Sequence, residues 1–204
     1  NLRKYGSLIF DCDGVVLKSN DLKTNSFYSV CLPYGKRSAE ELVNYHILNG
    51  GISRYVKFKY YLNSILPKYL PLDKLPPIEK LLKEYSNETY RGLLKCEIVE
   101  GLFELRKLTK ESNWLIVSGG DQEDLRRVFK ERNLYDLFDG GIFGSPEDKK
   151  TILRREIKNQ NIKETSLFLG DSKFDHIAAS YADIDFLFIS QWTEFKDFRD
   201  YCIG

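Results

Sequence analysis

The sequence lacks the charge imbalance, the cysteine motifs and the long apolar runs that mark several classes of protein. Its 204 residues include 31 lysines and arginines against 30 aspartates and glutamates, for a formal net charge of +1. This balance gives no overall field that favours a nucleic acid or a membrane surface as a partner. No apolar run reaches transmembrane length and the N-terminus shows no signal-peptide core, so we expect no membrane association.

The four cysteines are scattered, with no CxxC pair and no spacing typical of a Cys/His metal site. They are Cys12, Cys31, Cys96 and Cys202. This pattern argues against a zinc centre and against a disulfide framework, and it favours a reducing, cytoplasmic location. The length allows one substantial core, or a main domain with a second domain inserted into it.

Five short apolar runs, each closed by glycine, serine or aspartate, predict the strands of a parallel sheet. The runs are SLIFDCDG, NWLIVSGG, GGIFGS, TSLFLGDS and DFLFIS. Helical segments separate most of them, which indicates an α/β protein with a three-layer, Rossmann-like parallel sheet. The interval 16–97 shows helical patterns and no strand pattern. We therefore predict a core domain formed by residues 1–15 and 98–204, with an inserted all-helical cap domain at 16–97.

Within the predicted insertion, the segment SAEELVNYHILNGG indicates a helix that begins at Ser38 and ends before paired glycines. The phenylalanines and tyrosines of the insertion recur at helical spacing, and we expect them to pack between helices. His46 is expected to have a structural role. Hinges between the two domains are expected at 16–20 and 94–98.

Three polar clusters fall at the predicted carboxyl ends of strands, where open parallel sheets bind ligands. They are Asp11 with Asp13, Ser118 with Gly119 and Gly120, and Asp171 with Asp175. Carboxylates this close repel, so a cation or a proton must neutralise them. Mg²⁺ suits a site rich in aspartate that lacks His and Cys. Taken alone, DCDG is weak evidence for catalysis, because such acidic turns are also ordinary strand-ending loops or calcium ligands.

Two of these clusters have a second interpretation. A hydroxyl and consecutive amides in IVSGGD suit a phosphate cradle, but Ser118 is equally consistent with a helix N-cap. Asp171 is likewise a candidate N-cap of the following helix. Lys149 and Lys150 lie early in another helix, where lysines are ordinarily solvated.

Together these motifs resemble a known superfamily. The ordered set Asp11-Cys-Asp13-Gly14, Ser118, Lys149 and Gly170-Asp171-Ser172-x-x-Asp175 is similar to the four motifs of the haloacid dehalogenase (HAD)-like hydrolases, which are mostly magnesium-dependent phosphatases. The resemblance spans nearly the whole chain. The insertion resembles the helical cap of the branch that contains phosphoglycolate phosphatases and beta-phosphoglucomutases.

The resemblance implies a role for each motif. Asp11 is the expected nucleophile, which forms an aspartyl phosphate, and Asp13 is the expected general acid and base. Mg²⁺ would be held by the Asp11 side chain, the Asp13 main-chain carbonyl and Asp171. Asp175 would orient Lys149 or a metal-bound water. The expected phosphate-binding residues are Ser118, Gly119, Gly120 and Lys149. The spacing from Pro146 favours Lys149 for this role, and Lys150 is the alternative.

The cap segment LNGGISRYVKFKY resembles a substrate-contacting GxSR loop of the beta-phosphoglucomutase branch. Arg54 is therefore a candidate for a bidentate contact with a second phosphate or a carboxylate, with Lys57 as a weaker candidate. The alternative is a surface arginine after a helix turn. Lys18 departs from the acidic residue common after the first motif, which puts a familiar hinge interaction in doubt.

These observations predict a magnesium-dependent phosphatase that acts on a small phosphorylated metabolite, with a sugar phosphate as the leading candidate. Dehalogenases of the superfamily lack an aspartate at the position of Asp13, which favours phosphate esters. A phosphosugar mutase using the same phosphoaspartate is the nearest alternative. A phosphoacceptor signalling domain and a noncatalytic ligand-binding protein are further alternatives. We expect a monomer or homodimer.

Overall fold

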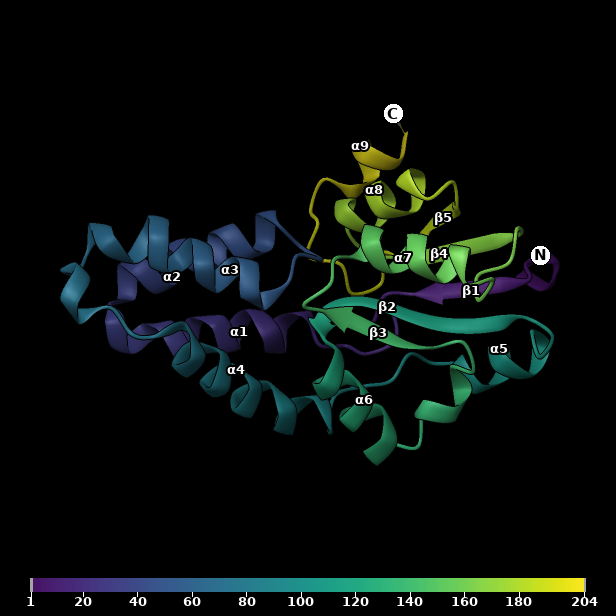
Figure 1. The fold of residues 1–204 in the computed structure, drawn as a ribbon, viewed down its shortest axis with the longest axis horizontal. Helices are drawn as coiled ribbons and strands as arrows, with labels where there is room; N and C mark the ends of the chain where they lie inside the picture. Colours follow the sequence, from purple (N-terminus) through teal and green to yellow (C-terminus); the bar gives the residue numbers. More distant parts are fainter. Residues whose placement is uncertain (1, 204) are drawn as a thin grey trace.

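The computed structural model describes residues 2–203, which are built around a five-stranded sheet (Figure 1). The strands are β1 (Ser7–Phe10), β2 (Asn113–Asp121), β3 (Gly141–Ser145), β4 (Ser166–Gly170) and β5 (Asp185–Phe188). Neighbouring strands are parallel in the order β3-β2-β1-β4-β5. Each predicted apolar run contains one of these strands, and the predicted α/β fold is confirmed.

Helices cover both faces of the sheet. The core helices are α5 (Leu102–Leu108), α6 (Gln122–Glu131), α7 (Lys149–Lys158), α8 (Lys173–Tyr181) and α9 (Phe198–Ile203), with a 3-10 turn at Tyr135–Leu137 and another at Leu2–Lys4. Leu8 and Phe10 of β1 pack on the side of α5 and α6, whereas Ile9 packs on the side of α7 and α8 (Figure 1). Burial on both faces is the reason that the central strands have continuous apolar sequences.

A second lobe consists of four α-helices between β1 and α5 (Figure 1). They are α1 (Asn20–Cys31), α2 (Lys36–Leu48), α3 (Arg54–Tyr60) and α4 (Ile78–Leu93), with a π-helical turn at Tyr61–Ile65 and 3-10 turns at Leu32–Tyr34, Leu66–Lys68 and Leu72–Lys74. The rings of Phe27, Phe58 and Tyr85 are buried together, with Phe27 4.3 Å from Tyr85 between centroids. These aromatic residues pack between helices as predicted.

The second cap helix begins at Lys36 and not at Ser38 as predicted. The residue before the helix is Gly35, whose φ of +126° is rarely adopted by other residues. The Ser38 hydroxyl lies inside the first turn and donates a hydrogen bond to the Gly35 carbonyl at 2.8 Å. Ser38 therefore bonds back to the residue before the helix instead of capping it.

The chain crosses between the two lobes twice, and the crossings lie side by side. Leu17 and Ile98 form an antiparallel bridge, and the Lys18 N–H donates to the Glu97 carbonyl at 2.9 Å. The side chains of Lys18 and Glu97 also form an exposed ion pair at 2.9 Å. These contacts join the two predicted hinges, and the predicted domain limits at 16–97 stay a prediction.

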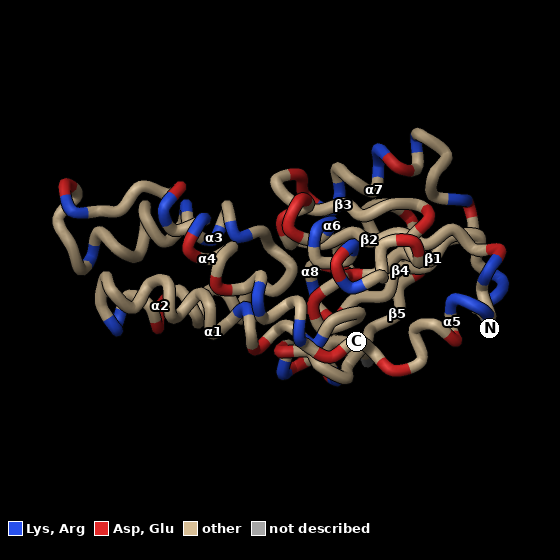
Figure 2. Tube along the Cα trace, turned by 90° about the horizontal axis from the view of Figure 1, so that it is seen from below, with Lys and Arg blue, Asp and Glu red and all other residues tan. Residues whose placement is uncertain are grey.

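Basic and acidic residues are interspersed over both lobes (Figure 2). This distribution agrees with the formal net charge of +1. Among residues 2–203, no helix has both the length and the hydrophobicity needed to cross a bilayer. Charge selectivity must therefore arise from local arrangements of side chains.

Candidate active site

The carboxyl ends of β1 and β4 place Asp11 and Asp171 next to each other. Each aspartate directly follows its strand, and the two strands are neighbours in the sheet. Gly14 permits the close approach, because its φ is +76° and a Cβ atom there would lie 2.1 Å from Asp171 Oδ2. The glycine of DCDG is thus required by the position of the second carboxylate.

Three buried carboxylates form a cluster that can hold a divalent cation. Oxygen atoms of Asp11, Asp171 and Asp175 lie within 4.8 Å of one another. Burial, reinforced by repulsion between these carboxylates, raises the pKa of Asp11 and that of Asp171 above the usual range. An all-oxygen set of crowded acidic groups fits the ligand preference of Mg²⁺.

Lys149 is the cation at the centre of this cluster. Its Nζ lies 3.0 Å from Asp11 Oδ2 and also donates to Asp175 Oδ1. The other oxygen of Asp175 accepts hydrogen bonds from the Ser172 N–H at 3.0 Å and the Ser172 hydroxyl at 2.7 Å. Both oxygens of Asp175 are thus engaged, and Asp175 orients Lys149. The neighbouring Lys150 lies over the ring of a tyrosine, 4.8 Å from its centroid.

Two helix caps differ from the alternatives that the sequence left open. Ser172 caps α8 and forms a capping box with Asp175, so Asp171 is not the cap and its carboxylate lines the cavity. Similarly, Asp121 caps α6, so Ser118 is not the cap of that helix. Both capping assignments are wrong, because the strand or turn continues for one or more residues before the helix begins.

Asp13 points away from the carboxylate cluster and toward α1. Its Oδ1 accepts a hydrogen bond from the Ser19 hydroxyl at 2.5 Å, and its Oδ2 lies 2.5 Å from Lys23 Nζ. Burial acts to raise the pKa of Asp13, but the Lys23 ammonium outweighs it and lowers that pKa. Asp13 is therefore held as a carboxylate, with its side chain outside the set that can ligate a metal.

The β2 end of the site lies directly under the cap. Ser118 is fully buried and its hydroxyl accepts a hydrogen bond from the Gly120 N–H at 3.0 Å. Gly119 and Gly120 line the cavity. A Cβ atom at Gly119 would lie 2.3 Å from the Gly51 carbonyl oxygen of the cap. A residue without a side chain is thus needed for the cap loop to contact the core here.

Arg54 also lines the cavity, but its guanidinium has partners within the protein. Its Nη1 lies 2.9 Å from Asp124 Oδ2 of α6 and donates to Ser86 Oγ of α4 at 2.5 Å. The hydroxyl of the next residue, Tyr55, donates to Asp121 Oδ2 at 2.6 Å. Two consecutive cap residues therefore fasten α3 to the start of α6, a connection that sequence reasoning missed.

Lys57 and His46 form the opposite wall of the cavity. Lys57 Nζ lies 2.7 Å from His46 Nδ1, and His46 Nε2 lies 3.0 Å from Thr24 Oγ1. The Thr24 hydroxyl donates to Glu194 Oε1 at 2.8 Å. Burial, followed by repulsion from a nearby lysine, lowers the pKa of Lys57 to about 7 and that of His46 well below its usual value. His46 thus takes part in the cavity wall, beyond its expected structural role.

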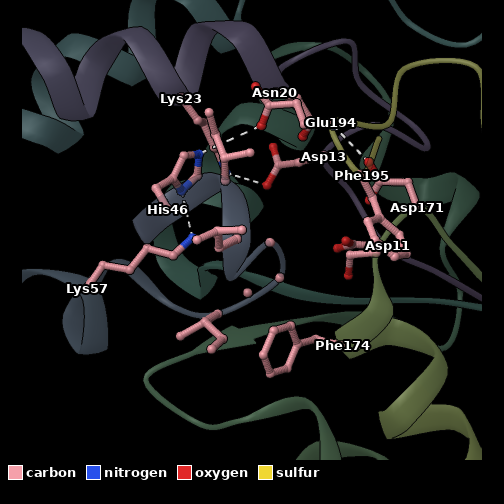
Figure 3. Close-up of a pocket in the computed structure, with 18 of the residues that line it drawn as sticks. Asp11, Asp13, Asn20, Lys23, His46, Lys57, Asp171, Phe174, Glu194 and Phe195 are labelled. Atoms are coloured by element: carbon pink, nitrogen blue, oxygen red, sulfur yellow. Dashed lines mark hydrogen bonds and ion pairs between the residues drawn. The ribbon is translucent and has the colours of Figure 1, made fainter. Parts of the chain in front are cut away.

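The cavity between core and cap has a volume of about 120 Å³. In Figure 3, Asp11 and Asp171 lie on one side of it and Lys57 and His46 lie on the other. Aromatic rings from both lobes complete the wall: Phe27, Tyr85, Phe174 and Phe195. The site therefore has an acidic end on the core and a basic end on the cap, joined by an apolar middle.

Sequence reasoning missed several polar residues of this cavity. Asn20 and Lys23 line the cavity and recur at helical spacing with Thr24 and the buried Phe27 on one face of α1, and Thr24 contacts His46 of the cavity wall. Asn20 Nδ2 donates to Asp171 Oδ2 at 2.8 Å. Polar side chains on the otherwise apolar face of a helix indicate a polar cavity beside that helix, so the sequence did contain a signal for these residues. Glu194, in the loop after β5, had no such signal.

The sequence matches the family model of the haloacid dehalogenase-like hydrolases over residues 8–189. The chain belongs to this family. The match includes both hinges and every residue proposed for the site from Asp11 to Asp175. The family membership and hydrolase class expected from the four motifs are confirmed. No match was found among curated protein sequences.

Solved structures with the same fold extend over most of the chain. A predicted phosphoglycolate phosphatase from Haemophilus somnus is 15% identical, with a TM-score of 0.70 over 91% of this chain and 85% of its own. CbbY from Rhodobacter sphaeroides, in complex with phosphate, is 16% identical, with a TM-score of 0.71 over 95% and 90%. YfnB from Bacillus subtilis, bound to magnesium, is 18% identical, with a TM-score of 0.63 over 90% and 88%. At these identities the likeness establishes the HAD-like fold.

Proposed function

We propose that this HAD-like hydrolase is a magnesium-dependent phosphatase of small phosphorylated metabolites, with a sugar phosphate as the first candidate. The observation that carries the proposal is the Asp11 carboxylate, which lines the cavity with Lys149 Nζ 3.0 Å from one of its oxygens. A buried carboxylate beside a fixed cation is suited to attack a phosphoryl group. Two structural relatives, a predicted phosphoglycolate phosphatase and a protein solved in complex with phosphate, support this chemistry.

In the proposed reaction, an Asp11 oxygen attacks phosphorus and the alcohol oxygen of the substrate departs, which leaves an aspartyl phosphate. Lys149 favours the ionised form of Asp11 and balances the charge of the phosphoryl group. The Ser118 hydroxyl and the amides of Gly119 and Gly120 lie at the end of β2, where they bind phosphoryl oxygens. The Gly120 amide becomes available when its hydrogen bond to Ser118 opens.

Asp13 acts as the general acid and then as the general base. It protonates the departing oxygen, and as a carboxylate it takes a proton from the water that hydrolyses the aspartyl phosphate. The contacts from Ser19 and Lys23 favour the ionised form of Asp13, which the second step needs. These contacts also keep its side chain away from the carboxylate cluster. For the first step Asp13 must take up a proton, which a phosphate monoester bound as its monoanion can supply.

The proposed Mg²⁺ ligands are the side chains of Asp11 and Asp171 and the main-chain carbonyl of Asp13. When bound, the ion offsets the negative charges that the nucleophile and the phosphoryl group bring together. Asp175 contributes by holding Lys149 in place. Lys57 is the proposed substrate contact from the cap, and Arg54, which lines the same cavity, would contact the substrate beside its ion pair with Asp124. Cytoplasmic location and a monomeric or dimeric state stay predictions.

A phosphate-release screen over phosphorylated metabolites, with and without Mg²⁺, tests the proposal. We expect Asp11→Asn to lower kcat by at least about 10,000-fold, because the amide oxygen is a poor nucleophile toward phosphorus. Asp73→Asn, at an exposed position of the cap, is the matched control and should retain activity. Equal activity of wild type and Asp11→Asn would refute the mechanism. Isomer formation without phosphate release would favour the mutase alternative.

A further inference from the structure

Lys57 is a buried cation with an unusual environment. It lies in α3, the residue is 2% exposed, and it lines the cavity opposite Asp11 and Asp171 (Figure 3). The one hydrogen-bond acceptor within reach of its Nζ, among the described residues, is His46 Nδ1 at 2.7 Å. No carboxylate of residues 2–203 lies within 4.0 Å of this ammonium. A buried cation whose partner is a neutral ring is poorly compensated.

The hydrogen bonds around His46 have a defined direction. An ammonium can only donate, so His46 Nδ1 accepts and the ring proton resides on Nε2. Nε2 then donates to Thr24 Oγ1 at 3.0 Å, and the Thr24 hydroxyl donates to Glu194 Oε1 at 2.8 Å. This chain joins α3, α2 and α1 of the cap to the loop after β5. These hydrogen bonds fix the position of the Lys57 ammonium, but they bring no negatively charged group into contact with it.

The other buried cations at the site are paired with carboxylates. Lys23 contacts Asp13, and Arg54 contacts Asp124. Lys149 contacts both Asp11 and Asp175.

Lys173 also lines the cavity, but it is exposed to water and lies 5.8 Å from the centroid of a tyrosine ring. Of the cavity cations that the structure describes, Lys57 is therefore the one that is both buried and without a carboxylate in contact. The pKa of Lys57, lowered to about 7 by burial and then by repulsion from Lys23, is a second sign of this charge deficit.

We propose that Lys57, oriented by His46, forms a subsite for a carboxylate of the substrate, so that the substrates are phosphate monoesters of small hydroxy acids. This inference rests on the proposed phosphatase function, since it places the phosphoryl group at Asp11. Asp11 and Lys57 face each other across the cavity, so one small molecule can place a phosphoryl group at Asp11 and a carboxylate at Lys57 (Figure 3). A sugar phosphate without an acidic group would leave Lys57 unpaired, so the subsite makes a phosphorylated hydroxy acid the first candidate substrate in place of the sugar phosphate.

The charges nearby favour a carboxylate over a second phosphate. The subsite has one ammonium to offer, because Lys23 and Arg54 are already paired. Glu194 Oε2 lies 3.9 Å from His46 Nε2, so its negative charge stands just behind the subsite and opposes a dianion. The cavity, at about 120 Å³, also suits a ligand of few atoms.

Matched pairs of substrates test the subsite. Phosphorylated hydroxy acids of two to four carbons are compared with alcohol phosphates of the same chain length, and kcat/KM for Mg²⁺-dependent phosphate release is measured for each. We expect the wild type to favour the acids by about 10- to 100-fold, which is typical of one charge-assisted hydrogen bond. Lys57→Met should bring this ratio close to one. Lys59→Met, at an exposed position of the same helix, is the control that keeps the ratio.

The outcomes separate the subsite from the function on which it rests. If no phosphate ester, including p-nitrophenyl phosphate, is hydrolysed in an Asp11-dependent manner, the phosphatase proposal fails. If esters are hydrolysed but the wild type does not favour the acids, or Lys57→Met retains the preference, the subsite is wrong. Lys57→Met should also melt no lower than the wild type, since it removes a poorly compensated buried charge. Lys57→Gln provides the same comparison should the Met variant not fold.

Discussion

The two ends of the cavity differ in the sign of the charge that lacks a partner. On the core, three carboxylates, those of Asp11, Asp171 and Asp175, lie close together, and the Lys149 ammonium contacts two of them, Asp11 and Asp175. On the cap, the Lys57 ammonium contacts a neutral histidine. Buried charge without compensation is costly, so each end is suited to receive a charge from outside. The core end is suited to a cation, and the cap end to an anion.

Among substitutions that change the charge balance of the two ends without removing the nucleophile, the largest effect is expected at the core end, from replacing Lys149. Lys149→Met leaves Asp11 facing two carboxylates and a phosphoryl group without a fixed positive charge. We expect kcat to fall by about 100- to 1,000-fold, the range for one preorganised electrostatic contact to a reacting group. Lys150→Met, one residue along α7 and over a tyrosine ring, should stay close to wild type. Similar losses in both variants would mean that the position of Lys149 has no special value.

The second prediction tests whether the core end takes up a cation. Adding Mg²⁺ should stabilise the folded protein, because the carboxylate cluster exists in the folded chain alone. At a free concentration of about 100 times Kd, the gain is about 2.7 kcal/mol, or about 5 to 10 °C in Tm for a chain of this size. Thermal melts with and without Mg²⁺ measure it. Asp171→Asn should lose most of the shift, and an unchanged shift in that variant would place the ion elsewhere.

The same contrast between core and cap separates what the sequence predicted from what it did not. In the core, Asp11 and Asp171 directly follow buried strands, so topology alone brings them to one edge of the sheet. The apolar runs and their order were sufficient to predict that edge. Gly14 was recognised as part of the motif, and the structure explains why a glycine is needed there. A Cβ atom at Gly14 would lie 2.1 Å from Asp171 Oδ2.

In the cap, helical periodicity indicated which residues pack but not what they pack against. Lys57 and Lys59 flank Phe58 and look alike in the sequence, yet Lys57 is buried at the cavity and Lys59 is exposed. Their difference arises from the rotation of α3, which is set by the burial of Phe58 against other cap helices. The contact of Thr24 with Glu194 depends on a core loop 170 residues away in the chain. Local sequence carries no signal for such a contact.

The third prediction uses pH to test the cap end alone. The groups whose charges act on Lys57 are Lys23 and Lys149, which lower its pKa, and Asp13 and Glu194, which raise it, while His46 contacts it directly. Burial is the largest cause, and the resulting pKa is about 7. The free site therefore holds an ammonium below pH 7 and loses it as the pH rises.

Binding of the carboxylate requires the ammonium, so KM for a phosphorylated hydroxy acid should be constant below about pH 7 and rise by about tenfold per unit above it. The alcohol phosphate of equal length is measured in parallel, and KM for the acid is divided by KM for the alcohol phosphate. Protonation changes at Asp11 and at the metal affect both substrates, so they cancel in this ratio. In Lys57→Met that ratio should not vary with pH. A wild-type ratio that stays level from about pH 6 to 9 would mean that Lys57 keeps its proton throughout, or that its charge does not select the substrate. The first possibility would be recognised by a preference for the acid at every pH, and the second by its absence.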